Sequence, residues 1–251
     1  MSKMKQRMKQ AVRRAIGEPY VGKRLKLRSL GHALAPLHLN PRAVIDAGGE
    51  DATFAYWLAD RWPRATVTAI DIDQASVDAC AAARPRRYAD RVRFECSPFD
   101  QLPPESADLV TAFDVLEHIE DDQRAIGDLS RALRPGGTIL VHVPRDQWTH
   151  ADGRVEVVAD VDAWQVNEGH VRMGYSVESL ADLCRQAGLE VVDTDLWVRR
   201  WGVRAHSLYR RLEHPRPARL LSVPFTDVAA MLDRRRPASE GNYVWMVARK
   251  P

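Results

Sequence analysis

The stretch Ala43-Val44-Ile45-Asp46-Ala47-Gly48-Gly49-Glu50-Asp51-Ala52 indicates the fold of this chain. Three apolar residues predict a short strand. An acid, a turn with two glycines and a predicted helix from about Thr53 to Trp62 follow it. A glycine in such a turn lets the backbone approach a ligand closely, and the next helix supplies unpaired N–H groups at its N-terminus. Ordinary strand-to-helix turns have the same pattern, so this stretch needs support from the rest of the sequence.

Strand and helix patterns alternate from Pro41 onward, and this alternation predicts a doubly wound α/β fold with a parallel sheet. In such sheets, ligands bind at the carboxyl ends of the strands. Further strands are expected at Thr66–Ile70, Val92–Cys96, Leu109–Phe113, Thr138–Val143, Glu190–Asp195 and Tyr243–Ala248. Helices are expected from the cap Asp73 to Ala83, over Asp121–Leu133 before the Pro135-Gly136-Gly137 turn, and over Ser176–Ala187, with Ser176 as N-cap and Gly188 at the C-terminal end.

A second acid, Asp71, ends the strand Thr66–Ile70, 25 residues after Asp46. A carboxylate at that place can accept hydrogen bonds from both hydroxyls of a ribose. Asp71 could also cap the next helix, but Asp73 is better placed to do so. The two acids together predict a ligand that contains adenosine.

The ligand is then either a nicotinamide dinucleotide or S-adenosylmethionine. A dinucleotide site needs further glycines so that the pyrophosphate reaches the helix N-terminus. Glu50 and Ala52 stand at those positions, and a carboxylate repels a pyrophosphate. A sulfonium cofactor has no phosphate, and nearby acids suit its positive charge. The charge of the loop therefore favours the methyl donor.

The motifs occur in the order typical of class I S-adenosylmethionine-dependent methyltransferases, which this chain resembles. After Asp46-x-Gly48 and Asp71 come Phe113-Asp114-Val115-Leu116-Glu117-His118-Ile119 and Leu133-Arg134-Pro135-Gly136-Gly137. The segment from Gly169 to Ser176 and Ala187-Gly188-Leu189 are similar to a subset found in glycan or natural-product pathways. The resemblance implies a Rossmann-like sheet of seven strands with the last strand antiparallel.

The resemblance also implies which residues bind the cofactor. The methionine end would contact Asp46, Gly48 and Gly49, while the ribose would contact Asp71 and the following Ile72. The adenine would lie at Ser97, Pro98 and Phe99, and the methionine amine and methyl would lie beside Asp114 and Val115. The family usually has glycine where this chain has Glu50 and Ala52, which narrows the conformations open to the loop.

Three residues are candidates for catalysis: His118, His170 and Tyr175. His118 could act as the base that deprotonates an acceptor, or it could satisfy backbone groups in its loop. His170, Arg172 and Tyr175 belong to an inserted segment with Trp148 and Trp164, which is expected to form a lid or the wall of an acceptor pocket. Asp146, His150 and Asp152 lack the tight spacing of metal ligands, so no metal is expected.

Charge divides the chain into a basic N-terminal arm, residues 1–40, and a methyltransferase domain, residues 41–251. The net charge is +3, but residues 1–28 hold ten Lys or Arg and one acid, so the remainder has a charge of −6. This distribution predicts no nucleic-acid groove. The helical pattern of residues 1–16 fits either a docking helix or a peripheral contact with an anionic surface. Three distant cysteines and the lack of an apolar membrane-spanning run predict a reduced, cytoplasmic protein.

The sequence therefore predicts a methyltransferase that acts on a small molecule, with O-methylation of a saccharide or secondary metabolite favoured. Segments 145–175 and 199–241 are expected to be insertions near the acceptor. The arginines of the second insertion suit an anionic acceptor, a subunit contact in a homodimer or simply a solvated helix face. Two alternatives stay open: a non-catalytic module that binds S-adenosylmethionine, and a nicotinamide-dependent oxidoreductase.

Overall fold

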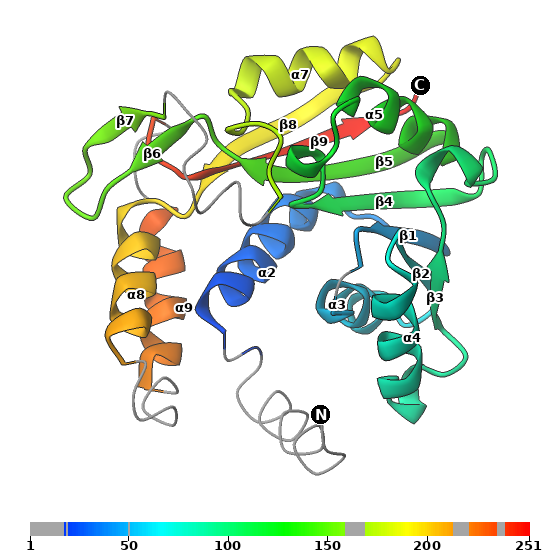
Figure 1. Cartoon of the computed structure of the whole chain (residues 1–251), viewed down its shortest axis with the longest axis horizontal. Coiled ribbons are helices and arrows are strands. Elements are labelled where there is room, and N and C mark those ends of the chain that lie inside the picture. The colour runs from blue at the N-terminus through cyan, green and yellow to red at the C-terminus, as the bar shows by residue number, and fades with distance from the viewer. Residues whose placement is uncertain (1–17, 19, 50, 159–168, 213–220, 235–238) are drawn as a thin grey trace. The chain divides into compact units, whose positions relative to one another are not determined.

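The computed structural model describes residues 18, 20–49, 51–158, 169–212, 221–234 and 239–251 (Figure 1). The chain forms two compact units. The helical unit contains the described residues within 18–32, 147–157 and 196–242, and the sheet unit contains those within 33–146, 158–195 and 243–251. The helix expected over residues 1–16, together with Glu50 and Trp164, lies outside the described residues. The domain boundary expected near residue 40 stays a prediction.

A seven-stranded sheet has the strand order β3-β2-β1-β4-β5-β9-β8. Its first five strands along the chain pair in parallel, whereas β9 pairs antiparallel with β5. This arrangement confirms the predicted sheet with its antiparallel last strand. The strands are β1 (Ala43–Ala47), β2 (Thr66–Asp71), β3 (Val92–Cys96), β4 (Ala107–Phe113), β5 (Leu133–Pro144), β8 (Glu190–Trp197) and β9 (Tyr243–Arg249).

Helices cover both faces of the sheet, with α3 and α4 on one face and α5 and α7 on the other (Figure 1). Their bounds are α3 (Thr53–Arg61), α4 (Gln74–Ala83), α5 (Asp122–Ala132) and α7 (Val177–Gln186). The caps are those expected from the sequence. Asp73 accepts hydrogen bonds from the amides of Ala75 and Ser76, and Ser176 accepts one from Ser179. Gly188, with a φ of 75°, follows α7.

The Pro135-Gly136-Gly137 segment differs from the expected turn before a strand. β5 already begins at Leu133, next to Ala107 of β4, and its register shifts before Thr138. The φ of Gly136 is 77°, in the left-handed region that glycine tolerates. The backbone can therefore bend within β5 and still exchange hydrogen bonds with Lys250.

An aromatic stack crosses the centre of the sheet. The ring of Phe54 on α3 stacks on Phe113 of β4, with centroids 4.5 Å apart. Phe113 stacks on His142 of β5 at 5.0 Å, and His142 stacks on Tyr243 of β9 at 4.9 Å. His142 is fully buried. The stack therefore packs α3 against three neighbouring strands, β4, β5 and β9, at the carboxyl end of β4.

The helical unit contains most of α2 (Val21–Leu34) together with α8 (Arg200–Arg211), α9 (Ser222–Asp233) and the hairpin of β6 (Gln147–Thr149) and β7 (Val155–Val157). The side chain of Arg24 on α2 donates to both carboxylate oxygens of Asp227 on α9. Trp197 donates its indole N–H to the carbonyl of Leu25 at 2.9 Å. The 199–241 insertion is thus mainly a helix pair. No described helix is both long and apolar enough to cross a membrane.

Candidate active site

The predicted cofactor residues lie at the carboxyl ends of adjacent strands. Asp46 in β1 pairs in register with Ala69 of β2 and with Thr111 of β4. Asp71 ends β2 opposite Cys96 of β3, which Ser97 follows. The strand order reverses between β1 and β4, and such a switch point is where open α/β sheets bind ligands.

Asp46 is a buried carboxylate, only 2% exposed. Its Oδ1 accepts a hydrogen bond from the hydroxyl of Thr111 at 2.8 Å, whereas its buried Oδ2 has no hydrogen-bond partner among the described residues. Burial raises the pKa of Asp46 to about 7, and the hydrogen bond from Thr111 opposes this rise. A cationic group that reached Asp46 would stabilise its ionised form.

The loop after β1 lies on the end of β2 and against the end of β4. The amides of Gly48 and Gly49 both donate to the carbonyl of Ile70, at 2.9 and 3.0 Å. A Cβ on Gly48 would lie 2.2 Å from Cγ2 of Val115, and φ at Gly48 is 77°. Glycine is therefore required at position 48 for two independent reasons, and Gly48 and Val115 are in direct contact.

Ala52 caps the N-terminus of α3 with a φ of 61°. This left-handed conformation costs an L-residue with a Cβ roughly 1 kcal/mol. Related methyltransferases usually have glycine at this position. The left-handed backbone explains this preference, because glycine adopts it without strain. The loop keeps a conformation that suits glycine, although its residue is alanine.

Asp71 and Ile72 lie next to the segment that follows β3. Asp71 accepts from the amide of Asp73 at 3.0 Å, and its carbonyl accepts from the amide of Ser97 at 3.1 Å. Ile72 is 78% exposed, which is unusual for a large apolar side chain. A small pocket has Gly49 and Asp71 in its wall. The structure thus brings together the residues predicted for the ribose and adenine.

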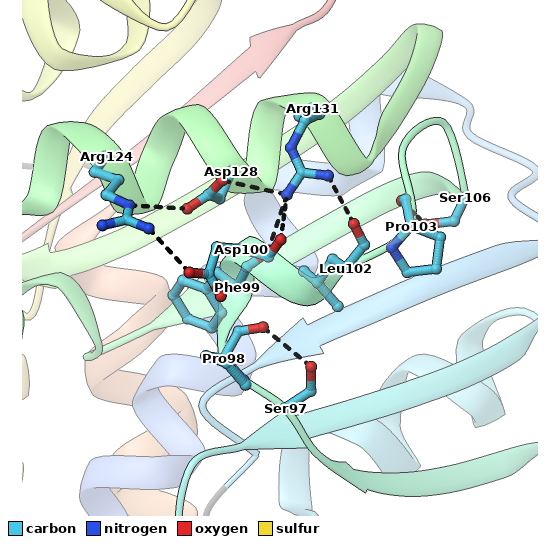
Figure 2. Close-up of polar contacts among 10 residues, drawn as sticks. All are labelled: Ser97, Pro98, Phe99, Asp100, Leu102, Pro103, Ser106, Arg124, Asp128 and Arg131. Carbon is cyan, nitrogen blue, oxygen red and sulfur yellow. Dashed lines mark hydrogen bonds and ion pairs between the residues drawn. The ribbon is translucent and has the colours of Figure 1, made fainter.

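Two arginines on α5 hold the loop that contains Pro98 and Phe99 (Figure 2). Arg131 donates to the carbonyls of Leu102 at 2.8 Å and of Asp100 at 3.0 Å, and Arg124 pairs with the Asp100 carboxylate at 2.9 Å. Sequence reasoning missed both arginines. Their only sequence signal is the Arg124–Asp128–Arg131 spacing, which places three charges on one side of a helix.

Asp114 follows β4 in a left-handed conformation, with a φ of 52°. Non-glycine residues are rare in this region and tend to mark functional sites. Its Oδ1 lies 3.2 Å from Nδ1 of His142, and its amide donates to the carbonyl of His142. Sequence reasoning missed His142, although a histidine within the apolar run of β5 is a detectable signal.

The three catalytic candidates are close in the fold but differ in exposure. His118 is exposed, and its ring lies 4.8 Å from that of the half-buried His170. Tyr175 is 5% exposed, and its hydroxyl donates to Asp122 at 2.7 Å. Burial, together with Asp122, raises the pKa of Tyr175 far above its usual range. This geometry favours a structural role for Tyr175.

Other residues singled out in the insertions have partners within their own unit. His150 pairs with Glu156 and Asp152 with Arg154, while Trp148 is 48% exposed. In the second insertion, Arg199 donates to the carbonyls of Asp233 and Glu240, and Arg200 pairs with the carboxylate of Glu240. Arginines that could suit an anionic acceptor therefore also stabilise the helix pair.

Comparisons with known proteins give the family. Residues 20–194 match the family described as Methyltransferase domain. A probable S-adenosylmethionine-dependent methyltransferase of Mycolicibacterium smegmatis is 33% identical over 153 residues, which are 61% of this chain and 54% of the relative. A trans-aconitate 2-methyltransferase of Delftia acidovorans is 26% identical over 186 residues, 69% of this chain and 63% of the relative. The chain spans about half the length of the curated relatives it matches.

Solved structures share the fold. The cyclase SpnF superposes with a TM-score of 0.60 and 25% identity, over 89% of this chain and 80% of that one. An S-adenosylmethionine-dependent methyltransferase from Mesorhizobium loti has a TM-score of 0.56 and 17% identity, over 87% and 96% of the two chains. Because the match covers more than half of the chain and includes every candidate site residue, this chain belongs to the methyltransferase domain family.

Proposed function

We propose that the chain transfers the methyl group of S-adenosylmethionine to an oxygen atom of a small-molecule acceptor. The observation that carries the proposal is the buried Oδ2 of Asp46, which has no hydrogen-bond partner among the described residues. A buried carboxylate is costly unless it is paired, and the ammonium group of the methionine end supplies the missing charge. Family membership supports the same donor.

The other strand ends support binding of the adenosine part. The Asp71 carboxylate is proposed to accept from the ribose hydroxyls, because Asp71 ends β2 and remains partly exposed. Ile72 and Phe99 offer apolar surfaces for the adenine ring. Ser97 and Pro98 directly precede Phe99 in the loop after β3, and Arg131 donates to the carbonyl of Asp100 in that loop.

The end of β4 is proposed to lie beside the reacting methyl. When bound, S-adenosylmethionine supplies an electrophilic methyl on its sulfonium sulfur. Val115 borders Gly48 and Asp114 directly precedes Val115, so both would flank the methionine end of the donor. His118 is exposed three residues after Val115, and we assign it to accept or orient the proton of the acceptor hydroxyl. His170 adjoins His118 and contributes to the same acceptor side.

The acceptor itself is the finer part of the proposal. The sequence favours a hydroxyl of a saccharide or secondary metabolite. Several relatives are named trans-aconitate 2-methyltransferase, and trans-aconitate is a carboxylate. Both acceptor types react through oxygen, and a carboxylate would need no base. A loss of turnover in His118→Ala with hydroxyl acceptors only would therefore separate the two.

Calorimetry with S-adenosylhomocysteine tests the donor half. We expect one binding site, with no binding of a nicotinamide dinucleotide under the same conditions. Absence of heat at millimolar S-adenosylhomocysteine would contradict the proposal. The acceptor half is tested by mass spectrometry, in which a methyl-labelled donor is incubated with panels of hydroxyl and carboxylate compounds.

A second candidate is a protein of this fold that binds the donor without transferring its methyl group. It is favoured by the likeness to SpnF, which is a [4+2]-cyclase, and by the non-glycine residues Glu50 and Ala52 in the loop. Label in any product would eliminate this candidate, whereas binding without label across both panels would favour it.

A further inference from the structure

Glu117, His118 and His170 form a cluster of potential metal ligands. One ligand atom from each residue lies within 4.8 Å of the other two. Glu117 and His118 belong to the short η4 (Leu116–His118) after β4, whereas His170 lies 52 residues beyond His118. Because this separation hides the cluster in the sequence, a metal was not expected there.

Two hydrogen bonds hold the cluster together on either side of His170. Nδ1 of His118 lies 3.1 Å from the carbonyl of Gly169, and the amide of Val171 donates to the carbonyl of Glu117 at 2.9 Å. The residues before and after His170 are thus fixed to the two residues that carry the other ligand atoms. These contacts of the Gly169 carbonyl and the Val171 amide fix the backbone of His170 beside Glu117 and His118.

The Gly169 contact also sets the orientation of the His118 ring. A carbonyl can only accept, so Nδ1 of His118 carries the proton and Nε2 keeps its lone pair. Metal-binding histidines generally donate their second ring N–H to a carbonyl or carboxylate, and this interaction orients the ring. Gly169 has a φ of 80°, so a glycine at this position allows the contact without strain.

The charges around the cluster suit a cation. The side chain of Glu117 is fully buried, and a carboxylate attracts a cation more strongly in the low-dielectric interior than at the surface. The neighbouring Arg172 pairs with Asp122 and donates to the carbonyls of Ile119 and Glu120.

The ligand types indicate the class of metal. Two imidazoles and one carboxylate suit zinc and similar transition metals, whereas Mg²⁺ and Ca²⁺ prefer oxygen ligands. Tetrahedral ligands around zinc lie roughly 3.4 Å apart, given bond lengths of about 2.1 Å. Because the ligand atoms lie within 4.8 Å of one another, the side chains must move closer by up to about 1.4 Å to bind zinc. Three protein ligands leave one coordination position open.

We propose that Glu117, His118 and His170 bind a divalent metal ion of the zinc class. The open position takes an oxygen atom of the acceptor, a second step that rests on the proposed function. His118 then acts as a metal ligand, and the ion would lower the pKa of the bound hydroxyl so that its proton passes to water. The acceptor oxygen would form its bond to the methyl carbon as the bond from that carbon to the sulfonium sulfur breaks. The cluster lies three residues beyond Asp114, close to the place assigned to the reacting methyl.

Metal binding is tested with the full, tag-free chain after treatment with a chelator. Titration with Zn²⁺ is followed by calorimetry, and titration with Co²⁺ by visible absorbance. We expect one equivalent to bind, and we expect His118→Ala and His170→Ala each to lower the affinity at least 100-fold. His150→Ala, which removes a histidine of the exposed His150–Glu156 pair, is the matched control and should bind as the unchanged chain does.

Equal metal affinity in His170→Ala and His150→Ala, or no stoichiometric binding to the unchanged chain, would overturn the proposal. Binding of S-adenosylhomocysteine to each variant reports whether the site of the donor is still folded. It also separates the two proposals: loss of Zn²⁺ binding with intact S-adenosylhomocysteine binding is the expected result for the histidine variants. Zn²⁺ binding by a chain that fails to bind S-adenosylhomocysteine would leave the metal site standing and reject the proposed donor.

Discussion

The two compact units use their charged residues differently. In the sheet unit, Asp46 is buried with one oxygen unpartnered among the described residues, and Asp71 remains partly exposed at a strand end. In the helical unit, buried polar groups bind one another: Arg199 donates to two carbonyls, and Asp233 accepts from the amides of Trp201 and Gly202. The buried polar groups that stabilise the helical unit form hydrogen bonds with one another, whereas those of the candidate site leave atoms available to bind a ligand.

Arg199→Ala should have the largest effect on stability, because Arg199 is only 3% exposed and its guanidinium binds buried carbonyls. We expect the free energy of unfolding to fall by about 3 kcal/mol, as for other buried charged hydrogen bonds. Denaturant unfolding measures this change. The control Arg185→Ala removes an exposed ion pair on α7 and should cost less than about 0.5 kcal/mol. Equal costs would contradict the structural role of Arg199.

Asp71→Ala should instead lower the affinity for the cofactor strongly and change the stability little. We expect affinity for S-adenosylhomocysteine to weaken by about 1.5–3 kcal/mol, because a charged acceptor of hydrogen bonds is lost. The matched control is Asp73→Ala, which removes a helix cap. It should lower the free energy of unfolding slightly and leave the affinity unchanged. Unchanged affinity in a folded Asp71→Ala variant would reject the ribose assignment.

Cofactor affinity should depend on pH through Asp46. Burial raises its pKa to about 7, so the carboxyl is mostly protonated at pH 6 and mostly ionised at pH 8. An ammonium group binds the ionised form, so affinity for S-adenosylhomocysteine should be about tenfold higher at pH 8 than at pH 6. Calorimetry at both pH values measures the change, and Asp46→Asn should abolish it. A pH dependence that survives in Asp46→Asn would assign the titration to another group.

Stability of the ligand-free chain should change with pH in the opposite direction. Because the pKa of Asp46 is higher in the folded state than its ordinary value, its contribution to stability is complete below pH roughly 4. That contribution is lost as the pH rises through about 7. Asp46→Asn should reduce this loss, which denaturant unfolding at pH 5 and pH 8 can measure.

Ala52→Gly should have the smallest effect. Glycine relieves the left-handed strain at a φ of 61°, but it also increases the entropy of the unfolded chain. We therefore expect stability to rise by no more than about 1 kcal/mol, measured as a shift in the denaturant midpoint. Gly136→Ala introduces the reverse change at a φ of 77° in a strand and should be destabilising. A clear loss of stability in Ala52→Gly would show that the backbone at position 52 is not strained by the alanine side chain.

Local patterns predicted the sheet unit well, because its signals are short in sequence. The bounds of Val92–Cys96 matched the structure, and so did the caps Asp73 and Ser176. The helical unit depends on contacts between residues far apart, such as Arg24 with Asp227 and Trp197 with Leu25, which no local pattern reveals. For the candidate site, the sequence predicted the residues at the carboxyl ends of adjacent strands, such as Asp46 and Asp71. The sequence shows an unusual histidine at position 142 and a charged spacing that includes Arg131, but not the contacts of these residues with the loops, which form only when β5 and α5 lie beside them.

The aromatic stack of Phe54, Phe113, His142 and Tyr243 has a consequence for redesign of the acceptor range. Removal of one ring from a packed stack leaves a cavity that costs several kcal/mol, so substitutions there are poorly tolerated. Substitutions at exposed positions of the segment after residue 168, such as Val171, meet no such penalty. Libraries for new acceptors should therefore vary that segment and leave the stack, which supports Asp114, unchanged.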